Sequence, residues 1–141
     1  MKKEIKYIGE QKRHKIEILW EQDKNFGSGV YMLIFSCNTI YIGKSKNIHN
    51  RIMGSDGHFD KLSEDKVIYD SAMKSNKVTV RVLKETTNSV DSSFYERVFI
   101  HEQAIKILKK LYGNEFKPKG KISKYKRVIN SCLLNQDLLN W

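Results

Sequence analysis

The sequence of 141 residues predicts an α+β domain with a small antiparallel three-stranded β-sheet flanked by helices. Two apolar runs, residues 30–35 and 39–43, are separated only by Ser36-Cys37-Asn38, and so short a connection favours a β-hairpin. A third strand is indicated by residues 77–83, where valines alternate with polar residues as in a half-buried strand. The other apolar residues recur at helical spacing, so the predicted order of elements is β-β-α-α-β-α-α.

The segment before the hairpin, residues 1–28, is expected to be a polar arm that packs in part against the domain. Its apolar residues include Ile5, Tyr7, Ile8, Ile16, Ile18, Leu19 and Trp20. They are too frequent for a solvated tail, and the glycines at the end of the arm are typical of a turn. No strand or helix is assigned to this segment.

Three shorter helices are expected after the hairpin. They cover residues 46–53, 63–74 and 125–139, and the first is ended by Gly54.

The longest helix is expected over residues 92–111, with Asp91 or Ser92 as its N-cap. Its predicted apolar stripe consists of Phe94, Val98, Ile105, Leu108 and Tyr112. At about 100° per residue, Glu102 lies roughly 80° from the centre of this stripe, at the border of the predicted buried face.

A single domain is expected, since domains commonly have about 100–150 residues. Within it we distinguish the arm (residues 1–28), a core (29–115) and a basic C-terminal extension (116–141) that carries the last helix. With 40% hydrophobic residues, the chain can form an ordinary core, which argues against intrinsic disorder.

Composition also excludes several classes of protein. No stretch approaches the ~20 apolar residues that a membrane span requires. Charged residues follow Met1-Lys2-Lys3 where the apolar region of a signal peptide would lie, so a cytoplasmic protein is expected. Cys37 and Cys132 are too few and too far apart for a disulfide scaffold or a zinc site.

Most of the net charge of +10 is concentrated in residues 106–127, which we call the basic segment. Nine basic residues and one acidic residue give it a net charge of +8, and Tyr112, Phe116 and Tyr125 lie among them. Such a segment suits a polyanion, because phosphate contacts favour clustered cations, whereas an anionic membrane would favour a cleaner apolar face. The predicted DNA-binding residues are Lys106, Lys109, Lys110, Lys117, Lys119, Lys121, Lys124, Lys126 and Arg127.

The predicted hairpin carries the most specific pattern in the chain. The triplet Gly29-Val30-Tyr31 is followed, after nine residues, by Tyr41-Ile42-Gly43. Lys44 comes next, and Arg51 lies eight residues past the second triplet, on the short predicted helix. This order resembles the GIY-YIG nuclease superfamily, with valine in place of one isoleucine.

The resemblance extends to the long helix and covers residues 29–114. There, Glu102 precedes Asn114 by twelve residues, as the metal-binding glutamate of the family precedes the asparagine that closes its last motif. Glu96 is the rival carboxylate, but only Glu102 has this interval to an asparagine. The family often places a proline before the final asparagine, whereas Pro118 follows Asn114 here.

The resemblance implies the GIY-YIG fold and hydrolysis of phosphodiester bonds in DNA. It implies Tyr31 as the general base and Tyr41 as the second phenol, although the reverse assignment stays open. A tyrosine has an ordinary pKa near ~10, so it needs help from a nearby cation such as Lys44. Arg51 has a fork of donors suited to a phosphate oxygen, where negative charge develops in the transition state.

The implied cofactor is Mg²⁺ bound by Glu102, and Mn²⁺ is expected to substitute for it. One carboxylate is enough, because Mg²⁺ keeps several of its waters. Gly29 and Gly43 are structural residues of the motif; Gly43 alone would suggest a bulge or a strand end. His58 is a further candidate, since some relatives use a histidine in this region, whereas His101 falls in the predicted stripe and is interpreted as a packing residue.

The expected partner is double-stranded DNA. The chain has no room for an extra DNA-binding domain, so it is most similar to stand-alone members, which include phage endonucleases and small restriction enzymes. A duplex has two scissile strands, which favours a homodimer or higher homo-oligomer, in a bacterial cell or a phage-infected host. The alternatives are a catalytically inactive nucleic-acid-binding module on the same fold and, more remotely, an RNA-processing enzyme.

Overall fold

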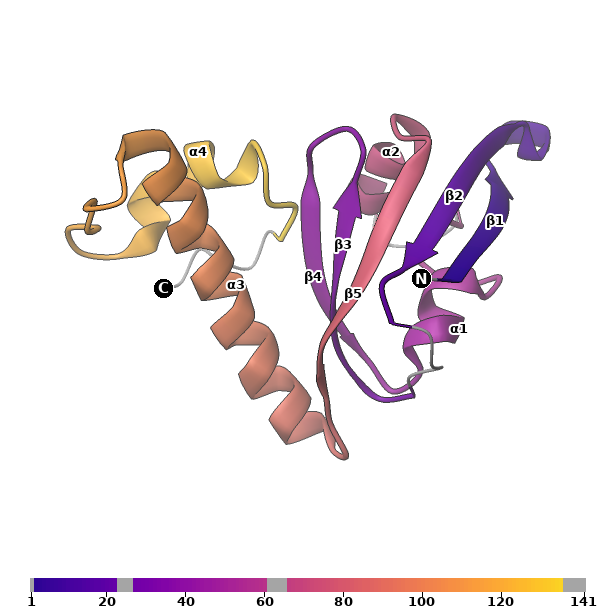
Figure 1. The fold of residues 1–141 in the computed structure, drawn as a ribbon, viewed down its shortest axis with the longest axis horizontal. Coiled ribbons are helices and arrows are strands. Elements are labelled where there is room, and N and C mark those ends of the chain that lie inside the picture. The colour runs from indigo at the N-terminus through magenta and orange to yellow at the C-terminus, as the bar shows by residue number, and fades with distance from the viewer. Residues whose placement is uncertain (1, 23–26, 61–65, 136–141) are drawn as a thin grey trace.

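The computed structural model describes residues 2–22, 27–60 and 66–135 and shows a mixed five-stranded sheet with helices beside it (Figure 1). The strands are β1 (Lys2–Ile8), β2 (His14–Trp20), β3 (Gly29–Phe35), β4 (Ile40–Ser45) and β5 (Lys77–Glu85). The helices are α1 (Ile48–Met53), α2 (Lys66–Met73), α3 (Ser89–Tyr112) and α4 (Lys126–Asn130), with short 3₁₀ turns η1 (Glu10–Lys12) and η2 (Ile122–Tyr125). The α+β class is confirmed, but the sheet has five strands rather than three, in the order β1-β2-β5-β3-β4.

The two additional strands come from the N-terminal arm. β1 and β2 form an antiparallel pair, and β2 joins β5 in parallel, from Glu17 opposite Lys77 to Trp20 opposite Val80. Their inward residues are buried in one cluster with the hairpin: Ile8, Ile16, Ile18 and Trp20. Apolar residues recur with a period of two over residues 16–20, as in a strand, while the parallel partner of this strand is 60 residues away along the chain. Residues 23–26 of the arm lie outside the described residues.

The hairpin of β3 and β4 forms as predicted, and its side chains alternate between two hydrophobic clusters. Tyr31, Leu33 and Phe35 pack with α1 and α2 on one face of the sheet. Val30 and Met32 pack with α3 and the C-terminal segment on the other. Successive side chains of a strand point to opposite faces, so the two faces of this hairpin meet different helices.

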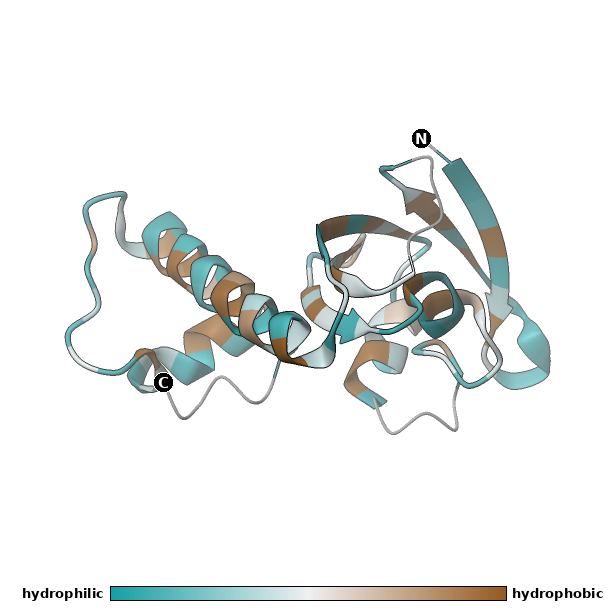
Figure 2. Cartoon of the chain, turned by 90° about the horizontal axis from the view of Figure 1, so that it is seen from below, coloured by the Kyte–Doolittle hydropathy of each residue, from teal (hydrophilic) through white to brown (hydrophobic). Residues whose placement is uncertain are grey.

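α3 begins earlier and is rotated relative to its prediction. Its N-cap is Asn88, whose side-chain oxygen accepts a hydrogen bond from the Asp91 amide, so both predicted caps were wrong. Phe94 and Tyr112, which were assigned to the stripe, are 61% and 51% exposed. The residues that α3 buries are Ser92, Ile100, Ala104, Ile107 and Leu108. Hydrophobic residues recur along α3, whereas the segment after it is largely hydrophilic (Figure 2).

The shorter helices are trimmed by local signals. α1 begins after Asn47, whose side chain accepts a hydrogen bond from the Asn50 amide. α2 ends at Met73, one residue before the end of the predicted helix 63–74, of which residues 63–65 lie outside the described residues. The predicted helix 125–139 ends at Asn130, and residues 136–139 are likewise not described. Within the described ranges, no helix has the length and apolar character needed to cross a bilayer.

Candidate active site

Three side chains on the α1 side of the hairpin form what we call the phenol cluster: Tyr31, Tyr41 and His58. β3 and β4 pair so that Tyr31 lies opposite Gly43, and Leu33 opposite Tyr41, which places both tyrosines on the same face. Tyr31 is fully buried and its hydroxyl is hydrogen-bonded to Nε2 of His58, which is 1% exposed. The Tyr41 ring meets the His58 ring nearly edge-on, with ring centroids 5.2 Å apart.

The absence of a side chain at Gly43 makes this packing possible. A Cβ atom there would lie 2.6 Å from Cε2 of Tyr41 and 2.7 Å from the hydroxyl of Tyr31, well inside van der Waals contact. Gly29 is constrained as well, since a Cβ would collide with the Lys84 carbonyl of β5, next to a register shift between Val30 and Tyr31. Close packing therefore explains why both positions of the motif are glycine.

His58 is brought to the tyrosines by the turn that follows α1. Its amide donates to the Arg51 carbonyl at 2.9 Å, and the Gly57 amide donates to the Gly54 carbonyl at 3.1 Å. A Cβ atom at Gly57 would collide with the Arg51 carbonyl, so the turn requires glycine at this position. The sequence carried this signal as two glycines between Arg51 and His58.

A polar cavity of about 360 Å³ opens beside Arg51. Its lining includes the cations Lys46 and Arg51, the amides Asn47 and Asn50, two serines and the carboxylate Asp56. An arginine fork with neighbouring amide donors suits a phosphate group. The cavity is therefore a candidate site for a phosphodiester, and its lining includes Gly57, the residue before His58.

Lys44 lies on the opposite face of the sheet from the phenols. It pairs with Val30 in the hairpin register, and its ammonium group is hydrogen-bonded to the hydroxyl of Ser93 on α3. The expectation that Lys44 assists a tyrosine is not met by this geometry, because neighbouring positions of a strand alternate in direction. Lys46 is the cation that shares the cavity with Arg51.

Glu102 is exposed and points away from the sheet. It lies nine residues past Ser93, about 180° round the helix and about 13 Å along it. Glu96 is half-buried and lies about one turn from both Ser93 and the buried Ile100, on the side of α3 that faces β4. His101 is exposed, since the apolar stripe is rotated from its predicted position.

Asn114 is also far from the hairpin. It is exposed beyond the C-terminal end of α3, about 30 Å along the helix from Ser93. Asn135 meets the hairpin instead: its side-chain oxygen accepts from the Ile42 amide at 2.9 Å, and its Nδ2 donates to the Ile42 carbonyl at 2.7 Å. Asn135 is 8% exposed and was missed, because its only sequence signal is a polar residue after Leu133-Leu134.

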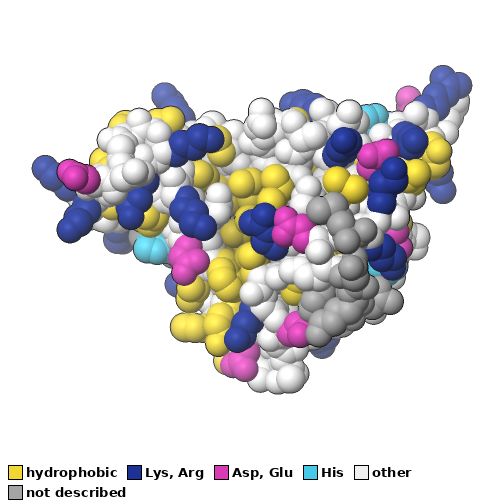
Figure 3. Space-filling model, in the orientation of Figure 1, with side chains coloured by type: hydrophobic (Ala, Val, Ile, Leu, Met, Phe, Trp, Pro, Cys, Tyr) yellow, Lys and Arg dark blue, Asp and Glu magenta, His cyan; other side chains and the backbone are white. Residues whose placement is uncertain are grey.

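All nine cations of the basic segment are exposed. The aromatic rings among them pack on one another, with centroids 4.9 Å apart for Tyr112 and Phe116 and 5.6 Å apart for Phe116 and Tyr125. Lys109 lies 16 residues past Ser93, about 24 Å along α3. On the face shown in Figure 3, several dark-blue cations lie at this end of the molecule.

Among the residues that the structure describes, no group of three or more His, Cys, Asp or Glu side chains gathers to hold a metal ion. A single carboxylate on the β4 side of α3 suits Mg²⁺, which binds through one or two carboxylates, substrate oxygens and water. It does not suit zinc, which takes three or four protein ligands. Glu96 lies nearer to the motif hairpin than Glu102 does, but like Lys44 it lies on the α3 face of the sheet, opposite the phenol cluster.

Comparison of the chain with family models, with curated proteins and with solved structures finds no match in any of the three.

Proposed function

We propose that the protein is a metal-dependent DNA endonuclease of the GIY-YIG type that hydrolyses phosphodiester bonds in a restriction or phage-type role. The observation that carries the proposal is the phenol cluster together with Arg51: two tyrosines on one face of the motif hairpin, a buried histidine bonded to one of them, and an arginine whose carbonyl accepts the His58 amide and which lines the polar cavity. Because duplex DNA has two scissile strands, a homodimer or higher homo-oligomer is part of the proposal.

In the proposed reaction, Tyr31 is the general base. Its hydroxyl proton passes to Nε2 of His58, and the resulting phenolate accepts a proton from the attacking water. Tyr41 meets His58 through its ring, and we assign the base to Tyr31 because its hydroxyl is hydrogen-bonded to the imidazole. Tyr31 is buried in the DNA-free protein, so the proposal requires the side chains around it to move when DNA binds.

The phosphodiester is proposed to occupy the cavity at Arg51, with Lys46 as a second cation. Both are fixed positive charges near the place where the pentavalent phosphorus gains negative charge. A bound Mg²⁺ or Mn²⁺ would neutralise charge on the phosphate and the leaving oxygen. We propose Glu96, which lies on the α3 face beside the edge strand β4, as its protein ligand in place of Glu102, so that the metal ion would bind at this edge of the sheet. We propose Asn135 in place of Asn114 as the asparagine that supports the motif hairpin.

Nicking of supercoiled plasmid tests this proposal. With Mg²⁺ or Mn²⁺, the wild-type protein is expected to convert it to open-circular and linear DNA, and chelation should stop the reaction. Glu96→Gln is expected to reduce the rate by roughly 10²-fold or more, as for loss of a metal ligand or a transition-state contact. Glu102→Gln, on the same helix and with the same loss of charge, should cut at the wild-type rate. Equal cutting by wild type, Glu96→Gln and Arg51→Ala would contradict the proposed site.

One observation favours a second candidate, a nucleic-acid-binding module without catalysis. The hydroxyl of Tyr31 is buried and already hydrogen-bonded, as in a tyrosine whose role is to hold a core together. DNA binding without cleavage under Mg²⁺, Mn²⁺, Ca²⁺ or Co²⁺ would support the module. Offering RNA beside DNA separates both from an RNA-processing enzyme.

A further inference from the structure

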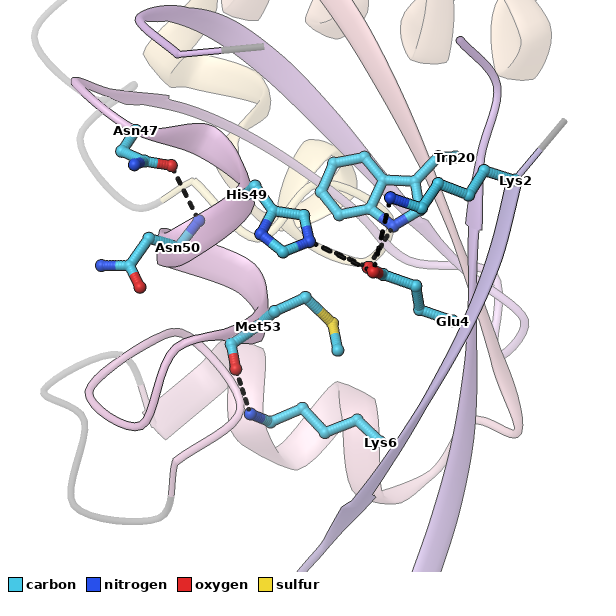
Figure 4. A network of polar contacts seen from close by, with 8 residues as sticks. All are labelled: Lys2, Glu4, Lys6, Trp20, Asn47, His49, Asn50 and Met53. Atoms are coloured by element: carbon cyan, nitrogen blue, oxygen red, sulfur yellow. Dashed lines mark hydrogen bonds and ion pairs between the residues drawn. The ribbon is translucent and has the colours of Figure 1, made fainter. Parts of the chain in front are cut away.

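Strand β1 lies beside α1, the helix that carries Arg51 (Figure 4). Glu4 and Lys6 are two positions apart on β1, so both side chains point to the same face of the sheet. Each of them contacts α1. Lys3, which precedes Glu4, and Ile5, which lies between the two, are exposed on the other face.

Glu4 holds the beginning of α1. Its carboxylate accepts hydrogen bonds from Nε2 of His49, at 3.1 and 3.2 Å, and from Nε1 of Trp20 at 2.9 Å. The rings of Trp20 and His49 are stacked, with centroids 5.4 Å apart. Burial by itself would raise the pKa of Glu4, but the hydrogen bonds from His49 and Trp20 lower it below its ordinary value, so this carboxylate is charged at neutral pH.

Lys6 holds the end of α1. Its ammonium group donates to the Met53 carbonyl at 2.9 Å and to the Gly54 carbonyl at 3.5 Å. A cation that binds the last carbonyls of a helix stabilises that end, because these groups have no partner within the helix. Burial lowers the pKa of Lys6, and Asp60 opposes this effect.

α1 depends on such contacts for its orientation. It has six residues, fewer than an isolated helix needs to be stable in water. Arg51 lies between the two contacts, and its carbonyl also receives the His58 amide. A change in the orientation of α1 therefore moves both the arginine and the histidine relative to Tyr31.

We propose that Glu4 and Lys6 are positioning residues of the candidate active site: the N-terminal hairpin clamps α1 from both ends and thereby aligns Arg51 and His58 with the tyrosines. This inference rests on the proposed endonuclease function for its effect on cleavage. It assigns the N-terminal arm to the alignment of the site rather than to DNA affinity.

The kinetic test compares Lys6→Met with Lys3→Met. Both variants lose one cation from β1, but Lys3 is exposed and pairs with Glu17 of β2, at 3.5 Å, rather than with α1. Lys6→Met is expected to lower kcat by roughly tenfold to a hundredfold with KM for DNA unchanged, as expected for a small misplacement of catalytic groups. Lys6→Arg, which can still donate to the carbonyls, should recover most of the loss. A rise in KM of equal size in both methionine variants, with kcat unchanged, would overturn the proposal.

Amide hydrogen exchange tests the clamp without any cleavage. The His58 amide, bonded to Arg51, is expected to exchange roughly tenfold faster in Lys6→Met, and at the wild-type rate in Lys3→Met, because only the former loosens α1. Glu4→Gln gives a second variant with the same expectation. Unchanged exchange of the His58 amide in both Lys6→Met and Glu4→Gln would refute the clamp. Faster exchange in these variants of a protein that cuts no DNA would refute only the endonuclease function.

Discussion

The phenol cluster and the basic segment are the two regions that the candidate function needs, and they are built in opposite ways. Tyr31 and His58 are buried, and a glycine is required beside them for lack of space. The nine cations of the basic segment are all exposed. A chemical site needs fixed geometry, whereas contacts to a phosphate backbone depend mainly on charge and tolerate variation.

The two regions are joined at the edge of β4. The Ile40 amide donates to the Cys132 carbonyl at 2.7 Å, and the Leu134 amide donates to the Ile40 carbonyl at 2.8 Å. Asn135 continues this contact at Ile42, inside the second motif triplet. The C-terminal segment thus connects the basic segment directly to the motif strand β4.

Tyr31→Phe is expected to produce the largest difference between cleavage, which depends on the phenol cluster, and DNA affinity, which depends on the basic segment. It removes the proposed base, so the cleavage rate should fall by roughly 10²–10⁴-fold while DNA affinity stays at the wild-type value. Single-turnover cleavage and fluorescence anisotropy with a labelled duplex measure the two quantities. Tyr112→Phe, in the basic segment, is the matched control and should leave cleavage unchanged; the opposite ranking would contradict the assignment.

Gly43→Ala is expected to damage the phenol cluster alone. The new methyl group overlaps both tyrosine rings, and overpacking of a core typically costs about 1–3 kcal/mol of unfolding free energy. Gly27→Ala is the control, because a Cβ there meets nothing nearer than the Lys46 carbonyl at 3.9 Å. Chemical denaturation compares the two, and equal stability of both variants would show that the cluster is looser than the structure indicates.

Asn135→Ala probes the connection between the regions. It leaves the buried amide and carbonyl of Ile42 without their side-chain partner, which costs about 1–3 kcal/mol. Asn114→Ala removes an exposed side chain and should change stability by less than about 0.5 kcal/mol. If Asn114→Ala were the more damaging, the asparagine assignment from spacing would be right and the one from contacts wrong.

Lys109→Gln combined with Lys110→Gln tests the basic segment with the smallest expected effect. The slope of log affinity against log salt concentration should fall by about two, since each lost phosphate contact removes about one. Cleavage of saturating DNA should be unchanged. Lys15→Gln combined with Lys77→Gln removes the same charge from β2 and β5 and should alter the slope less. Equal slopes for the two double variants would mean that DNA has no preference for the basic segment over other cations of the protein.

The hairpin, strand β5 and the long helix were predictable because their signals are local. Period-two alternation and short turns predicted the strands within a few residues. The rotation of α3 was not predictable, since Phe94 and Tyr112 are apolar but exposed, and only packing against β4 shows which residues are buried. The N-terminal strands were missed because their partner, β5, lies far along the chain.

The same difference applies to the candidate site. The sequence by itself determined the motif hairpin, the position of Arg51 one helix later and the concentration of positive charge in the basic segment, since all three are properties of neighbouring residues. Only the tertiary structure decided that His58 joins Tyr31, that Lys44 faces α3, that Glu96 rather than Glu102 faces the sheet, and that Asn135 supports Ile42. These contacts depend on strand register, helix rotation and chain return, which arise when distant segments pack together and are not encoded in the spacing of a motif.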